Sequence, residues 1–275
     1  MLLAVLQGFS ELFPISSLGH TVLVPALLHW SIDRSDPTFL AFVVALHLGT
    51  AIALIVFYRK DWVGIVRAFA GSIARGRIGD GRDERTAWLL VFGTIPVAVA
   101  GVFLEKPVRQ MFGSTEIVSV FLIVNAGIMF LGERLRRRAT SATRSLDALP
   151  FVDAVKVGGA QALALFPGIS RSGSSIVAGL LCDLTHEDAA RYSFLLATPA
   201  IGAASLLEIP RLLEPAARGM LVEALVGGVL AGLTAYASVA FLTKYFQSND
   251  LRPFGWYYLI FGAATFALAA AKVIQ

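Results

Sequence analysis

The chain has 275 residues, of which 56% are hydrophobic and only 15% are charged, and its mean hydropathy is +0.72. This composition excludes an ordinary soluble domain and predicts a single integral membrane domain over residues 1–275. The net charge of +4 does not indicate a nucleic-acid partner, because the basic residues lie in loops between apolar runs. The single cysteine, Cys182, excludes an intramolecular disulfide, and we interpret it as a packing residue.

The first apolar segment is interrupted near Pro14 by a polar stretch rich in glycine and serine. Proline removes a backbone donor, and glycine-rich backbone unwinds easily. In hydrocarbon, such backbone is tolerated only where protein or a water-filled cavity satisfies its polar groups. We therefore expect residues 2–28 to form a re-entrant helical hairpin that enters the membrane from outside.

Six apolar runs with few charges follow, each near the length of about 20 residues that crosses a bilayer as a helix. The runs are residues 39–58, 87–104, 117–132, 192–207, 224–243 and 253–271. Seven basic residues lie within 59–85 and six within 134–156, so the positive-inside bias places these two loops in the cytoplasm and the N-terminus outside. Residues 71–85 are expected to form a cytoplasmic loop with an amphipathic portion on the lipid surface.

Another polar stretch, around Pro167, matches the one near Pro14 when the chain is shifted by 154 residues, which superposes Gln7 on Gln161. We expect residues 153–182 to form a second re-entrant hairpin, entering from inside. Three spans follow each hairpin, and because three is odd the second copy is inverted. The predicted fold is all-α and polytopic, with six transmembrane helices and two re-entrant hairpins in an inverted-topology repeat, approximately 1–133 and 153–275.

The upstream stretch holds the first group of candidate site residues. Gln7 and Glu11 are four residues apart and share a helix face, so their oxygens suit Mg²⁺ or Ca²⁺, although a simple hydrogen bond within the helix also explains the spacing. Ser17 and His20 follow as a candidate nucleophile and base. Ser16 or Ser17 is also expected to cap the next helix.

The downstream stretch places Arg171 among serines in an apolar region. A planar guanidinium with neighbouring hydroxyls suits a phosphate group, while an ion pair between Arg171 and Glu11 is the alternative in the absence of ligand. We expect substrate contacts from Ser16, Gly168, Ser170, Arg171, Ser172 and Ser175. We interpret His47 as a packed, hydrogen-bonded histidine, Asn125 as a helix contact and Glu133 as a boundary residue.

These two motifs resemble the signatures of the undecaprenyl-diphosphate phosphatase family, the bacitracin-resistance proteins. The upstream motif is similar to a pattern in which Glu or Gln stands four residues before a Glu, and a turn of the form Pro-x-Ser-Ser-x-Gly-His follows. The downstream motif is similar to the pattern Pro-Gly-x-Ser-Arg-Ser-x-x-Thr. The chain has Gln7 in the slot often filled by glutamate, and Ser175 in place of the threonine. The change at Gln7 leaves one negative charge fewer for a metal.

The resemblance implies a role for each group of residues. Glu11 and Gln7 take the place of the metal-linked pair. Ser17 and His20 take the place of the catalytic turn. Ser170, Arg171 and Ser172 take the place of the diphosphate clamp. Whether Ser17 or His20 is the nucleophile stays open.

The resemblance also implies the activity: hydrolysis of undecaprenyl diphosphate to undecaprenyl phosphate and inorganic phosphate, in the bacterial plasma membrane, at a site that opens to the outer face. A transporter of undecaprenyl phosphate with the same midplane site is the alternative. A lipid phosphatase of the acid-phosphatase type is excluded, because Ala178 stands where its histidine is required. Gly227, Gly228 and Gly232 permit close helix packing within a protomer or in a homodimer.

Overall fold

The structure is a computed structural model that describes residues 1–30, 37–111, 114–139, 143–212 and 219–274. Within these ranges all regular elements are helices, which confirms the predicted all-α class. In chain order they are α1 (Leu2–Leu12), α2 (Ser17–Leu27), α3 (Pro37–Phe57), α4 (Arg59–Arg75), α5 (Arg82–Met111), α6 (Thr115–Arg138), η1 (Leu146–Ala148), α7 (Phe151–Ala162), η2 (Leu163–Leu165), α8 (Arg171–Leu181), α9 (His186–Leu212), α10 (Leu221–Tyr245) and α11 (Arg252–Ala270).

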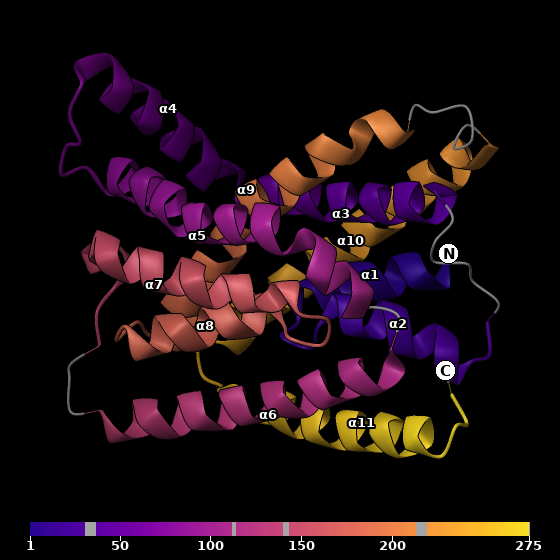
Figure 1. Ribbon diagram of the computed structural model, residues 1–275. Coiled ribbons are helices and arrows are strands. Elements are labelled where there is room, and N and C mark those ends of the chain that lie inside the picture. The colour runs from indigo at the N-terminus through magenta and orange to yellow at the C-terminus, as the bar shows by residue number, and fades with distance from the viewer. Residues whose placement is uncertain (31–36, 112–113, 140–142, 213–218, 275) are drawn as a thin grey trace.

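Two pairs of short helices, α1 with α2 and α7 with α8, extend into the molecule from opposite ends (Figure 1). Each of these helices has 11 or 12 residues. At a rise of about 1.5 Å per residue, none is long enough to cross a hydrocarbon core of about 30 Å. The breaks between the paired helices contain Pro14 and Pro167, and they meet in the interior, where Ser16 Oγ donates to Ile169 O at 3.4 Å.

Long helices follow each short pair: α3, α5 and α6 in the first half, and α9, α10 and α11 in the second. These helices have 19 to 30 residues. Among the described residues, α5, α6, α10 and α11 are long and apolar enough to cross a membrane, and the bent pair of α3 and α4 makes a fifth if it counts as one span. The chain is therefore a multi-pass membrane protein. The predicted count of six stays a prediction.

The limits predicted for the loop over residues 71–85 are wrong. Helix α4 begins at Arg59, bends by 87° from α3 and continues to Arg75, while α5 begins at Arg82. The sequence suggested a loop because this stretch is basic and contains glycines. Yet α4 has an apolar side that packs on α5, as in the contact between the rings of Phe69 and Trp88 at 5.3 Å.

The true turn between α4 and α5 is short and held by one carboxylate. Gly76 adopts a left-handed conformation, with φ 63°, and so ends α4. Glu84 accepts hydrogen bonds from Gly79 N at 2.6 Å and from Arg75 Nη2 at 2.5 Å. These two hydrogen bonds tie the start of α5 to the end of α4.

Each short pair is fixed on the other half of the chain by close backbone packing. Helix α1 lies against α10, and α7 lies against α5. A Cβ atom on Gly8 would lie 2.1 Å from Ala231 O, and one on Gly158 would lie 2.1 Å from Gly93 O. Both contacts therefore require glycine, and they place the two hairpins in equivalent environments.

The glycine stripe of α10 packs within the protomer. Gly227 faces Phe42, Gly228 faces Ala45, and Gly232 faces Gly49, so all three lie against α3. This stripe is therefore not available to a second copy of the chain. A homodimer through another surface stays a prediction. Cys182 is buried in the core, as expected of a packing residue.

Candidate functional site

The tip of the upstream hairpin is built around a capped turn. Ser16 is the N-cap of α2, and its Oγ accepts a hydrogen bond from Gly19 N at 3.2 Å, which confirms the predicted cap. The backbone of Ser16 has φ 65°, a left-handed value that is strained for a residue other than glycine. Such strain concentrates at functional sites. The next residue, Ser17, donates its Oγ hydrogen to Glu11 on α1.

The carboxylate of Glu11 joins the two hairpins. One oxygen, Oε2, accepts hydrogen bonds from Ser17 Oγ at 2.5 Å and from Gln7 Nε2 at 3.0 Å. The other, Oε1, accepts from Arg171 Nη2 at 3.2 Å. Both side chains of this ion pair are largely buried, with 7% of Glu11 and 13% of Arg171 exposed. The ion pair between Arg171 and Glu11, which the sequence offered as the alternative in the absence of ligand, is therefore present.

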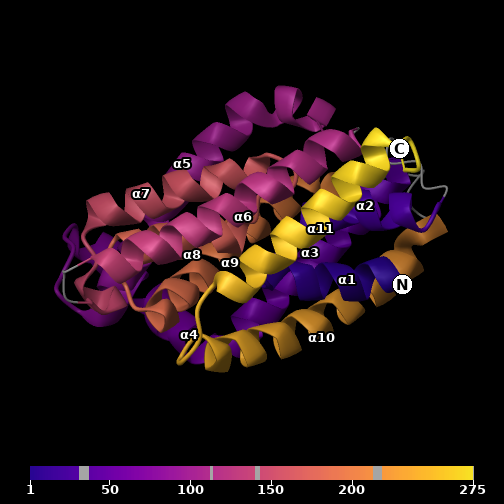
Figure 2. The ribbon, with the colours of Figure 1, turned by 90° about the horizontal axis from the view of Figure 1, so that it is seen from below.

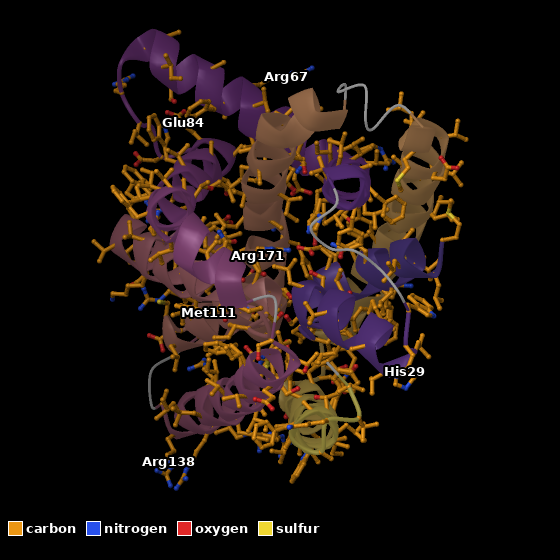
Figure 3. The ribbon with its side chains drawn as sticks, turned by 45° about the vertical axis from the view of Figure 1, so that its right-hand side comes forward. His29, Arg67, Glu84, Met111, Arg138 and Arg171 are labelled. Atoms are coloured by element: carbon orange, nitrogen blue, oxygen red, sulfur yellow. The ribbon has the colours of Figure 1, made fainter. Side chains whose placement is uncertain are left out.

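Arg171 lies near the middle of the molecule, away from the peripheral residues Arg67 and Arg138 (Figure 3). Its Nε and Nη1 atoms are buried and have no hydrogen-bond partner among the described residues. A buried guanidinium N–H without a partner is costly. The unused donors are therefore suited to a charged acceptor, and a phosphate group accepts two parallel hydrogen bonds from a guanidinium.

Serine hydroxyls surround Arg171 at the start of α8. Ser170 is the N-cap of α8, and its Oγ accepts from Gly173 N at 3.1 Å. Ser172 Oγ lies 3.1 Å from Ser170 Oγ and donates to Phe13 O at 3.3 Å, which is a further link between the hairpins. The N-terminus of a helix favours anions, because its first amides lack partners within the helix.

Two of the predicted substrate contacts face elsewhere. Ser175 Oγ donates to Arg171 O at 2.8 Å and lies 2.7 Å from Ser193 Oγ on α9. Gly168 has φ 106° and lies against α6, where an added Cβ would be 2.6 Å from Val118 O. Their contact with substrate stays a prediction.

Both ring nitrogens of His20 have hydrogen-bond partners other than Ser17. Its Nδ1 lies 2.7 Å from Ser16 O and its Nε2 lies 2.5 Å from Tyr257 Oη. The partner of Ser17 Oγ is Glu11. The expected pairing of a serine nucleophile with an imidazole base is thus replaced by a pairing of Ser17 with a carboxylate.

Three residues at the site were not predicted from the sequence. His47 Nε2 lies 3.1 Å from Gln7 Nε2 and 3.6 Å from Glu11 Oε2. Asn125 Oδ1 accepts from Ser170 N at 3.3 Å, and its Nδ2 is buried without a partner among the described residues. A polar residue inside an apolar run was the available signal for His47 and Asn125. The sequence held no such signal for Tyr257, since tyrosine is common in membrane helices.

The family model described as bacitracin resistance protein BacA matches residues 1–264. The chain belongs to this family. The match extends over both hairpins and all the long helices up to α11, so BacA-family membership applies to the whole architecture and not to one motif.

Several BacA-family relatives are named undecaprenyl-diphosphatase. The chain is 47% identical to one from Acidiphilium cryptum, over 98% of this chain and 96% of the relative. It is 48% identical to undecaprenyl-diphosphatase 2 from Chromobacterium violaceum, over 95% of each chain, and 44% identical to a protein from Mycobacterium avium, over 97% and 95%. These names do not favour the transporter alternative.

Proposed function

We propose that this chain is an undecaprenyl-diphosphate phosphatase, which converts undecaprenyl diphosphate to undecaprenyl phosphate and inorganic phosphate and so recycles the cell-wall lipid carrier. Membership of the BacA family and the names of its relatives support this activity. The observation that carries the proposal is the contact of Glu11 with both Ser17 and Arg171, because it joins a nucleophile, a base and an anion-binding group in one buried place.

We propose six spans, α3, α5, α6, α9, α10 and α11, with the pairs α1–α2 and α7–α8 as re-entrant hairpins of an inverted repeat. The order of elements supports this, since each half begins with two short helices and continues with three long ones. The site lies between the hairpin tips, and we place its opening at the outer face of the bacterial plasma membrane. The basic loops at the other ends of the long helices support that orientation.

Ser17 is the proposed nucleophile. Its Oγ attacks the terminal phosphorus, the bond from that phosphorus to the bridging oxygen breaks, and undecaprenyl phosphate leaves as an anion. The Ser17 proton passes to Glu11 Oε2, with which Ser17 already shares a hydrogen bond of 2.5 Å. Water then attacks the phosphorus of phosphoserine, the bond from phosphorus to Ser17 Oγ breaks, and inorganic phosphate leaves with both water protons. Ser17 Oγ regains its proton from Glu11.

Arg171, Ser170 and Ser172 are the proposed clamp for the diphosphate. The buried Nε and Nη1 atoms of Arg171 gain acceptors when a phosphate binds, which supports this role. Donors that are already oriented toward the transferring group stabilise its negative charge without reorganisation in the transition state.

A divalent cation, Mg²⁺ or Ca²⁺, is the proposed cofactor. Among the described residues no group of three His, Cys, Asp or Glu residues is suited to hold a metal. The Glu11 carboxylate, and the Gln7 amide once its oxygen replaces Nε2 on the side of Glu11, would hold such an ion, with its remaining ligands from water and the substrate phosphates. Such an ion, when bound, would neutralise part of the diphosphate charge.

The proposed reaction is tested by trapping a phosphoenzyme during hydrolysis of undecaprenyl diphosphate and locating the phosphate by mass spectrometry. We expect it on Ser17. Ser17→Ala is expected to lower phosphate release by about 10²-fold or more, because it removes the nucleophile. Ser10→Ala is the matched control. Ser10 is a buried serine like Ser17, but it lies on α1 and donates to Leu6 O. Phosphate on His20, or on neither residue, would contradict Ser17 as the nucleophile.

A further inference from the structure

The hydroxyl of Tyr257 makes direct contact with the imidazole of His20. Tyr257 belongs to α11, at the opposite end of the chain from His20 in α2, and its Oη lies 2.5 Å from His20 Nε2. The histidine is 3% exposed, whereas the tyrosine is 37% exposed. Tyr257 therefore lies between a buried imidazole and the outside of the helix bundle.

The other hydrogen bond of His20 determines its tautomer. His20 Nδ1 lies 2.7 Å from Ser16 O, and a carbonyl oxygen only accepts. Nδ1 therefore carries the proton, and in the neutral ring Nε2 is an acceptor. It follows that the Tyr257 hydroxyl donates to Nε2.

Ring stacking holds the same imidazole in one plane. The Phe261 ring lies 5.1 Å from the His20 ring at an angle of 6°, and the Tyr257 ring lies 5.7 Å from it at 11°. Tyr257 and Phe261 are four residues apart on α11, so they lie on the same face of that helix, and their own rings stack at 5.5 Å. Helix α11 thus supplies both a hydrogen bond and two stacking surfaces.

We propose that Tyr257 is a positioning residue of the phosphatase reaction, which acts through His20. With Ser16 O on one nitrogen and Tyr257 Oη on the other, the imidazole has one tautomer and one orientation. This inference rests on the proposed function and on His20 as part of the catalytic turn, where its Nδ1 holds the backbone of Ser16, next to the proposed nucleophile Ser17. It assigns to α11, which contributes none of the motif residues, an indirect part in catalysis, through the orientation of His20.

The first test is Tyr257→Phe, which keeps the stacked ring and removes only the hydroxyl. We expect kcat for phosphate release to fall about 10-fold to 100-fold, as when a partner that orients a functional histidine is removed, with KM little changed. Tyr236→Phe is the matched control, because Tyr236 on α10 is 41% exposed and its ring contacts Phe57, not His20. A kcat for Tyr257→Phe equal to that of the control would overturn the proposal.

The other test is 15N NMR of the imidazole nitrogens, which a general loss of packing would not mimic. In the wild-type protein we expect a protonated Nδ1 and a hydrogen-bonded Nε2 for His20, assigned by comparison with His20→Asn. In Tyr257→Phe we expect the Nε2 resonance alone to move toward that of a free lone pair. An Nε2 without a hydrogen bond in the wild-type protein would overturn the proposal even if the variant did not fold. Wild-type protein that releases no phosphate would instead contradict the proposed function.

Discussion

Glu11 and Arg171 satisfy each other only in part. The carboxylate accepts hydrogen bonds from Ser17, Gln7 and Arg171, whereas Arg171 uses only its Nη2 atom and leaves Nε and Nη1 without partners among the described residues. An arginine with spare buried donors is suited to a second anion. The ion pair and the phosphate clamp are therefore not exclusive alternatives, because the same guanidinium can serve both.

Arg171→Lys tests the geometry of this clamp at the residue scale. Lysine keeps the positive charge but loses the planar fork, so we expect kcat/KM for undecaprenyl diphosphate to fall about 10²-fold. Arg67→Lys is the control, because Arg67 is exposed on α4. A wild-type kcat/KM in Arg171→Lys would mean that charge alone matters and that the spare donors do not bind phosphate.

At the scale of elements, the two hairpins depend on equivalent glycine contacts. Gly8 of α1 meets the backbone of α10, and Gly158 of α7 meets the backbone of α5. The middle long helix of each half thus supports the hairpin of the other half (Figure 2). This exchange explains how two short, interrupted helix pairs are held in place between long helices.

Gly158→Ala tests this packing, with Gly159→Ala as the neighbouring control. A methyl group at Gly158 would collide with Gly93 O, so we expect a destabilisation of about 1–3 kcal/mol, measured as a lower melting temperature in detergent. No atom lies within 4 Å of a Cβ at Gly159, and alanine is the better helix former, so that variant is expected to melt no lower than the wild-type protein. Equal melting temperatures for the two variants would contradict the close approach of α7 and α5.

At the scale of the whole molecule, the sequence predicts helix positions well because apolar runs and proline breaks are local features. It also offers the ion pair between Glu11 and Arg171 as one of two alternatives, because both residues stand in polar stretches that lipid does not tolerate. The contacts of His47 and Tyr257 depend on which long helices lie beside the hairpins, and the sequence of one chain does not state that. The extent of α4 was missed for a different reason, since its basic composition is typical of a cytoplasmic loop.

The account depends most on the contact between the upstream and downstream hairpins through Glu11 and Arg171. A double-mutant cycle on thermal stability tests it directly, with Glu11→Gln, Arg171→Met and the double variant. Removal of one partner leaves a buried charge unpaired. We therefore expect the stability losses of the two single variants to add up to more than the loss of the double variant, with a coupling of about 0.5–3 kcal/mol. Strictly additive losses of stability would contradict the account, because they would mean that the two side chains do not meet.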